Sequence, residues 1–239
     1  MIDFKVEDLK PLCGDFGLTL TDGAVERLNI YGNLLLEKNK VMNLTAITEP
    51  REVLYKHFYD CLLFFSAVDV PANAKIIDVG TGAGFPGVVL KIARPDIDIT
   101  LLDSLAKRVN FLREVLSGLS LEGKAIHLRA EEGGKAPELR ESFDIACARA
   151  VAGLNVLGEY CVPFVKPGGL FVAMKGGEPQ KEVLEGTAAL KILGCSEPQI
   201  KEAKLPQGDK RSFIIAKKIS QTPPKYPRNS AKIAKAALI

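Results

Sequence analysis

The stretch Ile76-Ile77-Asp78-Val79-Gly80-Thr81-Gly82-Ala83-Gly84-Phe85-Pro86-Gly87 decides the fold of this chain. A short apolar run ends there in glycines that are packed more densely than a turn requires. Glycines at a strand end let the chain turn sharply and let backbone N–H groups approach a ligand, and the next helix points its N-terminus at that ligand. The stretch predicts a cofactor-binding loop, and the alternative is a tight turn without a ligand.

The glycine spacing alone does not specify the cofactor, because Gly82-x-Gly84-x-x-Gly87 also satisfies the dinucleotide-binding pattern. Two details favour S-adenosylmethionine. Asp78 lies inside the strand end, two residues before the first glycine, where a carboxylate is placed to help hold a ligand ammonium. The glycines also run as Gly80, Gly82, Gly84 and Gly87.

A second acid follows at the end of the next apolar run, Asp98-Ile99-Thr100-Leu101-Leu102-Asp103. Asp103 stands about twenty residues past the loop, the usual distance to a carboxylate that binds a ribose. An ionised carboxylate accepts hydrogen bonds from two hydroxyls at once. We therefore expect Asp103 to clamp the ribose of an adenosine cofactor; an exposed acid at a strand end is the alternative.

Around this loop, β-branched strands alternate with amphipathic helices, which predicts an α/β domain with a largely parallel sheet. The expected strands are Lys75 to Val79, Ile97 to Asp103, Ala125 to Leu128, Phe143 to Ala148, Leu170 to Lys175 and Ser212 to Lys217. The ligand should lie at the carboxyl ends of these strands.

Three regions are expected along the chain. Residues 1–70 are predicted to be helical, with Thr21 as a helix cap and a second helix that starts near Thr48 and carries His57. Residues 71–219 form the cofactor-binding domain. Residues 220–239 are rich in proline, lysine and alanine and contain no acid, which predicts a flexible basic tail.

Composition places the chain among ordinary globular proteins. Its 239 residues carry a net charge of +3, which permits nucleic-acid binding without requiring it. No apolar run is long enough to span a membrane, and no signal peptide is apparent. The five cysteines include no Cys-x-x-Cys pair, which fits a reducing cytosol and predicts neither a disulfide framework nor a metal site. The expected location is the cytoplasm, and the expected state is a monomer.

Several further motifs carry a resemblance to a known family. They are Asn43-Leu44-Thr45-Ala46-Ile47, His57-Phe58-Tyr59-Asp60, Leu101 to Arg108, Arg129-Ala130-Glu131, Ala148-Arg149-Ala150, Met174-Lys175-Gly176 and Tyr226-Pro227-Arg228. Together with the glycine loop they span most of the chain, and they resemble the bacterial 16S ribosomal RNA guanine-N7 methyltransferase G family, also called glucose-inhibited division protein B. Cys61 and Ala148 depart from the family pattern, as does the tail after Arg228.

The resemblance implies a Rossmann-like class I fold and transfer of a methyl group from S-adenosylmethionine to N7 of a guanosine in 16S RNA of the small ribosomal subunit. The implied cofactor contacts are Asp78, Gly80, Thr81, Gly82, Gly84, Phe85, Asp103, Ala130, Glu131 and Arg149. Ala130 and Glu131 stand where adenine would be bound. Arg149 is the implied catalytic residue, in a positioning role toward the base O6 or a phosphate.

Candidate RNA contacts also follow from the resemblance and from the placement of basic residues. They are Asn43, His57, Lys107, Arg108, Lys175 and Arg211, with Thr45, Asp60 and Lys210 nearby in the pattern. Each basic residue also fits a merely solvated surface role. For Asn43 and His57 the alternatives are a helix cap and a buried, hydrogen-bonded imidazole.

The implied chemistry needs no general base, because guanine N7 is a neutral ring nitrogen whose lone pair can attack the sulfonium methyl directly. Other methyl transfers leave different marks. Enzymes acting on exocyclic amines generally place an Asn/Asp-Pro-Pro-aromatic run after the fourth strand, where this chain has Cys147 to Val151. Pyrimidine C5 enzymes need a nucleophilic cysteine, and Cys147 lies within an apolar strand that predicts an inert core residue.

Three other functions remain open at this point. A small-molecule methyltransferase on the same fold is the main alternative. A nicotinamide-dependent dehydrogenase is disfavoured because the sequence after Asp103 continues as strands of one sheet and leaves no separate substrate domain. A non-catalytic RNA-binding module with an empty glycine loop is the third, and cofactor binding would distinguish it.

Overall fold

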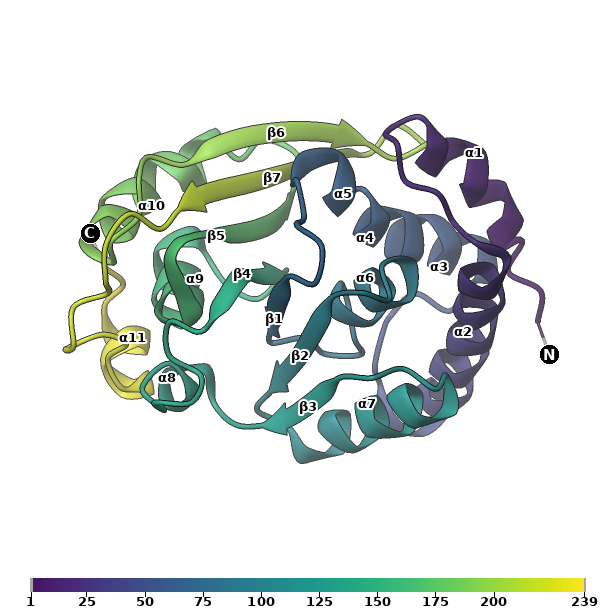
Figure 1. The fold of residues 1–239 in the computed structure, drawn as a ribbon, viewed down its shortest axis with the longest axis horizontal. Helices are drawn as coiled ribbons and strands as arrows, with labels where there is room; N and C mark the ends of the chain where they lie inside the picture. The colour runs from purple at the N-terminus through teal and green to yellow at the C-terminus, as the bar shows by residue number, and fades with distance from the viewer. Residues whose placement is uncertain (1, 239) are drawn as a thin grey trace.

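A computed structural model describes residues 2–238, and its centre is one twisted sheet with helices on both faces (Figure 1). The strands are β1 (Lys75–Val79), β2 (Asp98–Asp103), β3 (Lys124–His127), β4 (Phe143–Arg149), β5 (Val165–Gly176), β6 (Gln199–Lys204) and β7 (Lys210–Lys217). Their order in the sheet is β3-β2-β1-β4-β5-β7-β6. The strand order therefore reverses between β1 and β4, which is where such sheets bind ligands.

The pairing is parallel from β3 through β5, and β7 runs antiparallel to both β5 and β6. All six expected strands form. The strand β6 was not expected, because this edge strand is mostly exposed and its Lys-Glu-Ala-Lys run lacks an alternating apolar face.

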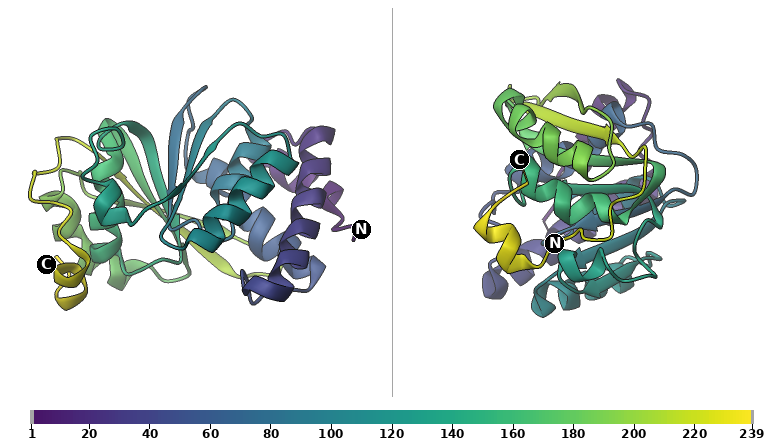
Figure 2. Two further views of the ribbon diagram at one scale, coloured as in Figure 1. Left: turned by 90° about the horizontal axis from the view of Figure 1, so that it is seen from below. Right: turned by 90° about the vertical axis from the view of Figure 1, so that its left-hand side faces the viewer.

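Side chains that alternate along the strands enter two separate cores. Ile76 packs into the core beneath the N-terminal helices, whereas its neighbour Ile77 packs into the core on the opposite face. The first face is covered by α2 (Asp22–Met42), α6 (Gly87–Ala93) and α7 (Ala106–Gly118), and the second by α9 (Leu154–Cys161) and α10 (Gln180–Ile192). Figure 2 shows the sheet between these two layers, with the termini at opposite ends.

The N-terminal helices pack directly onto the sheet domain rather than forming a separate body. They are η1 (Val6–Asp8), α1 (Leu9–Gly14), α2, α3 (Pro50–Val53), the π-helical η2 (Leu54–Tyr59), α4 (Asp60–Leu62) and α5 (Phe64–Ala67). Tyr31 of α2 is fully buried, and its hydroxyl donates a hydrogen bond to Ala83 O in the glycine loop at 2.6 Å. The N-terminal helical region thus packs against the glycine loop and holds it through this hydrogen bond.

Two helix starts can be compared with the sequence expectations. Thr21 caps α2, and its hydroxyl oxygen accepts a hydrogen bond from Ala24 N at 3.2 Å. The next helix starts one residue later than expected, because the carboxylate of Glu49, not Thr48, accepts the hydrogen bond from Glu52 N. His57 then lies on η2, as the second expected helix required.

The C-terminal segment differs from the flexible tail that its composition suggests. Tyr226, Ile233 and Leu238 are buried, and the segment forms α11 (Ser230–Lys235). Arg228 pairs with Glu159, whose carboxylate is completely buried on α9, at 2.7 Å. Composition alone did not reveal this packing because the partner acid lies 69 residues away in the sequence.

Two short elements complete the fold. They are α8 (Ala130–Gly133), which follows β3, and η3 (Val162–Phe164), which precedes β5. Among the helices of residues 2–238, none combines the length and the apolarity of a membrane span.

Candidate active site

The glycine loop turns sharply between β1 and α6, and its glycines have two different tasks. Gly80 and Gly82 have φ angles of +71° and +62°, in the left-handed region. A Cβ on Gly82 would meet no protein atom within 4 Å, so its backbone borders open space. A Cβ on Gly84 would instead lie 2.8 Å from Tyr31 Oη. Only the first part of the loop is therefore exposed to a ligand, and Gly84 is needed for close packing.

Asp78 is completely buried at the end of β1. Its Oδ2 accepts hydrogen bonds from Thr81 Oγ1 at 2.6 Å and from Gly87 N at 2.8 Å. Its Oδ1 is buried with no partner. Burial raises the pKa of this carboxyl to about 6, against the lowering effect of the two hydrogen bonds. The free oxygen fits an ammonium group, whereas the Thr81 side chain is turned toward Asp78.

Asp103 ends β2 with both carboxylate oxygens already engaged. Oδ2 accepts a hydrogen bond from Gly82 N at 3.0 Å and lies 3.5 Å from Arg108 Nη1, and Oδ1 accepts from Leu105 N at 2.9 Å. Each oxygen keeps a lone pair. Asp103 therefore fixes the glycine loop and still has acceptors for hydroxyl groups.

A cavity of about 160 Å³ lies at the carboxyl ends of β1, β2 and β3, and we name it the β2 cavity. Its lining includes Gly80, Asp103, Ala130, Glu131, Val151 and Tyr160. Four of these were expected from the sequence. Val151 and Tyr160 were missed, because neither belongs to a motif. Tyr160 reaches the cavity from α9, whose position relative to β3 is set only by tertiary packing.

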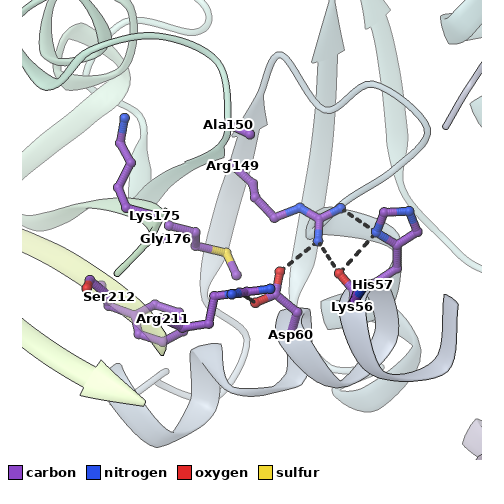
Figure 3. A pocket seen from close by; sticks show the side chains of 11 residues that line it. Lys56, His57, Asp60, Arg149, Ala150, Lys175, Gly176, Arg211 and Ser212 are labelled. Carbon is purple, nitrogen blue, oxygen red and sulfur yellow. Dashed lines mark hydrogen bonds and ion pairs between the residues drawn. The ribbon is translucent and has the colours of Figure 1, made fainter. Parts of the chain in front are cut away.

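A larger pocket of about 460 Å³ lies at the ends of β4, β5 and β7, and we name it the β4 pocket. Its lining includes Lys56, His57, Asp60, Arg149, Lys175 and Arg211, shown in Figure 3. Arg149 and Ala150 line this pocket while the next residue, Val151, lines the β2 cavity. The turn after β4 therefore separates two neighbouring cavities along one sheet edge.

Arg149 is held by contacts on several sides (Figure 3). Its Nη1 donates to Asp60 Oδ2 at 2.9 Å, and its guanidinium carbon lies 4.9 Å from the centre of the Phe85 ring. Arg211 Nε donates to Asp60 Oδ1 at 2.6 Å. Asp60 thus bridges two arginines that come from β4 and β7, and the Phe85 ring packs against the guanidinium of Arg149.

His57 contributes a neutral imidazole to the same pocket. Its Nε2 lies 2.8 Å from Thr45 Oγ1 and its Nδ1 lies 3.2 Å from Arg149 Nη2. Its ring stacks on Phe85 with centroids 4.5 Å apart. Burial and the positive charge of Arg149 lower the pKa of His57 to about 3. The histidine is therefore uncharged near neutral pH.

The remaining candidate RNA contacts do not all come together. Asn43 ends α2 in the left-handed conformation, exposed and outside the pocket lining, as a helix cap. Lys107 is exposed on α7 and Arg108 faces Asp103, so both lie on the side of the β2 cavity. Lys175 pairs with Glu182 at 2.6 Å and points away from Arg149 (Figure 3). His57 and Arg211 are the two candidates that the structure places beside Arg149.

Cys147 lies inside β4, fully buried, and burial raises the pKa of its thiol well above the usual value. This burial agrees with the inert core residue that the sequence favoured at this position. All five cysteines are buried and unpaired, and residues 2–238 contain no cluster of three or more potential metal-ligating side chains.

The strand order and the position of both cavities at the strand ends are those of the Rossmann-like fold of class I S-adenosylmethionine-dependent methyltransferases. Solved structures agree on the fold. A methyltransferase from Pyrococcus furiosus superposes with a TM-score of 0.55 at 14% identity, covering 82% of this chain and 98% of that one. A SAM-dependent methyltransferase from Aquifex aeolicus gives a TM-score of 0.51 at 16% identity, covering 72% and 96%.

Sequence comparison gives the family. Residues 24–213 match the family model GidB, described as rRNA small subunit methyltransferase G. Relatives named Ribosomal RNA small subunit methyltransferase G include one from Desulforamulus reducens, 47% identical over 95% of both chains, and one from Alkaliphilus metalliredigens, 48% identical over 92% of this chain and 93% of the relative. The chain belongs to this family and is a methyltransferase.

Proposed function

We propose that this protein transfers a methyl group from S-adenosylmethionine to N7 of a guanosine in 16S ribosomal RNA of the small subunit. The family name supports ribosomal RNA as the substrate class. We further propose that the protein acts in the cytoplasm as a monomer. The observation that carries the proposed reaction is the protonation chemistry of the β4 pocket.

No side chain that lines this pocket is a free general base. Its one acid, Asp60, accepts hydrogen bonds from two arginines, and its histidine has a pKa lowered to about 3 by burial and by Arg149. A pocket of this kind suits a nucleophile that has no proton to lose. Guanine N7 is such a nucleophile, and in-line displacement at the sulfonium methyl then needs only alignment.

The residues at the carboxyl ends of β1, β2 and β3, in and beside the β2 cavity, fit the cofactor. Asp103 has lone pairs for ribose hydroxyls, the Ala130 N–H and the Glu131 carboxylate suit the adenine edge, and the unpartnered Asp78 Oδ1 suits the ammonium. A Cβ on Gly82 would meet no protein atom within 4 Å, so its backbone leaves room for the ligand. In this proposal Thr81 and Gly84 act indirectly, since Thr81 holds Asp78 and Gly84 packs on Tyr31. When bound, the cofactor supplies an electrophilic methyl on a positively charged sulfur.

Arg149 is the proposed positioning residue for the base. Its donors should meet guanine O6 or a phosphate and not N7, because a hydrogen bond to N7 would occupy the attacking lone pair. Phe85 and Asp60 hold the guanidinium in place. Alignment of reacting atoms in a desolvated pocket can lower a barrier by roughly 7–11 kcal/mol, so positioning alone can carry much of the rate.

The RNA would lie across the rim of the β4 pocket. Lys56 and Arg211 line the pocket, and Lys210 precedes Arg211 on β7. We propose that these basic residues contact phosphates. A base stacked within a helix cannot enter such a pocket, so we expect an unpaired or flipped-out guanosine.

The test is to map 7-methylguanosine in small-subunit RNA from cells with and without this gene, by borohydride reduction and aniline cleavage. One cleavage site should be present with the gene, absent without it, and restored by the wild-type gene but not by one that encodes Arg149→Ala. Identical cleavage patterns with and without the gene would refute the proposed function.

A further inference from the structure

The β4 pocket contains an acid whose presence the positioning of Arg149 does not fully explain. Lys56, Arg149, Lys175 and Arg211 give the lining four cations, whereas Asp60 is its one acid. The Asp60 side chain is 8% exposed, and it lines the pocket. An electropositive pocket would attract phosphate more strongly without this carboxylate, so the acid suggests recognition of a hydrogen-bond donor.

Asp60 retains the capacity to bind such a donor. Its Oδ2 accepts one hydrogen bond from Arg149 and its Oδ1 accepts one from Arg211. A carboxylate has about four acceptor sites, so one remains on each oxygen. The two arginines also fix the orientation of the carboxylate, because they approach it from β4 and β7, two different strands of the sheet.

A pair of free acceptors side by side matches guanine. The Watson–Crick edge of guanine presents two adjacent donors, N1–H and N2–H, whereas that of adenine presents the N6 amine beside an acceptor nitrogen. This edge also lies across the purine from N7. A guanine held by Asp60 would therefore direct N7 away from Asp60. This is the orientation needed to meet a methyl group delivered from the neighbouring β2 cavity.

We propose that Asp60 selects guanine by accepting hydrogen bonds from N1–H and N2–H of the target base, an inference that rests on the proposed function. Asp60 is then a specificity-determining residue that touches the substrate. Sites built to hydrogen-bond a substrate group discriminate strongly against an analogue that lacks the group, because buried acceptors are left unpaired.

Inosine provides the substrate-side probe, since it keeps N7, O6 and N1–H and lacks only the N2 amine. Small-subunit RNA is transcribed with about one guanosine in ten replaced by inosine, used bare or reassembled with small-subunit proteins, and methylated by the purified enzyme. Mass spectrometry of the nucleosides gives the ratio of 7-methylguanosine to 7-methylinosine. Both products form in one reaction, so the ratio is independent of how much active enzyme is present.

The wild-type enzyme should enrich 7-methylguanosine about tenfold or more over the input ratio. Asp60→Asn should reduce this enrichment to less than about threefold, because the amide replaces one acceptor by a donor. Asp60→Ser, which removes the carboxylate without adding a fixed donor, should do the same. Arg211→Gln is the matched control: it removes one partner of Asp60, but the carboxylate stays and is still oriented by Arg149 at 2.9 Å, so the enrichment should persist even if total methylation falls.

The outcomes separate this inference from the proposed function. No 7-methylated purine from the wild-type enzyme refutes the proposed function itself. If the wild-type enzyme produces 7-methylguanosine but enriches it less than twofold over 7-methylinosine, the proposed role of Asp60 is wrong. This result is sufficient even if both Asp60 variants are inactive. Full enrichment retained by Asp60→Asn also overturns it.

Discussion

Replacing Gly82 by valine tests whether the open space beside the glycine loop is the cofactor site. At a φ of +62°, a side chain strains the backbone by about 1–2 kcal/mol. A Cβ would meet no protein atom within 4 Å, so the variant should fold. The valine would, however, occupy the space through which a ligand approaches the loop.

The size of the effect on binding follows from what the loop must give up. To admit the cofactor past valine, the loop has to move, which breaks the hydrogen bond from Gly82 N to Asp103 Oδ2. A hydrogen bond to a charged group contributes about 1.5–3 kcal/mol. At 1.4 kcal/mol for each factor of ten, the dissociation constant for S-adenosylmethionine should rise by about 10- to 150-fold.

Gly17→Val is the matched control. Gly17 has a φ of +79°, and a Cβ at this position would likewise meet no atom within 4 Å. Gly17 follows α1, far from the strand ends in the sequence, whereas Gly82 is bonded to Asp103, which lines the β2 cavity. Both variants should lose similar stability in urea unfolding, and only Gly82→Val should lose cofactor affinity in titration calorimetry. Unchanged affinity in Gly82→Val, or an equal loss in Gly17→Val, would refute the loop assignment.

Three further predictions concern other parts of the molecule. Arg149→Ala should lower the methylation rate by about 100-fold, while the circular dichroism spectrum stays native because Asp60 keeps its bond to Arg211. Full activity of this variant would show that Arg149 does not position the base. Burial raises the pKa of Asp78 to about 6, so this carboxyl binds its proton more tightly in the folded protein than in the unfolded chain. The unfolding free energy should therefore fall by on the order of 3 kcal/mol as pH rises from about 4 to 6, and Asp78→Asn should remove this pH dependence. Arg228→Ala leaves Glu159 buried without its ion-pair partner and should destabilise the protein by about 3 kcal/mol in urea unfolding. Lys232 is exposed, so Lys232→Ala should change stability little, and equal effects of the two variants would mean that the C-terminal segment is not anchored by Arg228.

The sequence predicted four residues that line the β2 cavity, because each of them follows a strong local signal. Asp78, Gly80, Asp103, Ala130 and Glu131 all stand at or just after the end of an apolar strand. Parallel strands bring their carboxyl ends to one edge, so residues with this local placement must gather there. Tyr160 shows the limit of such reasoning, since it reaches the same cavity from the middle of a helix.

What the sequence by itself determined is therefore the α/β sheet, its glycine loop and the acids at its strand ends, since short-range patterns of apolar residues and glycines are sufficient to specify them. Tertiary structure alone decided which residues surround Asp60. Asp60 precedes Arg149 by 89 residues and Arg211 by 151, and only the packing of η2 and α4 against β4 and β7 brings the three together. Tertiary structure also decided that the C-terminal segment packs. A carboxylate buried on α9 is strongly destabilising unless an arginine pairs with it, and that arginine lies 69 residues away in the sequence.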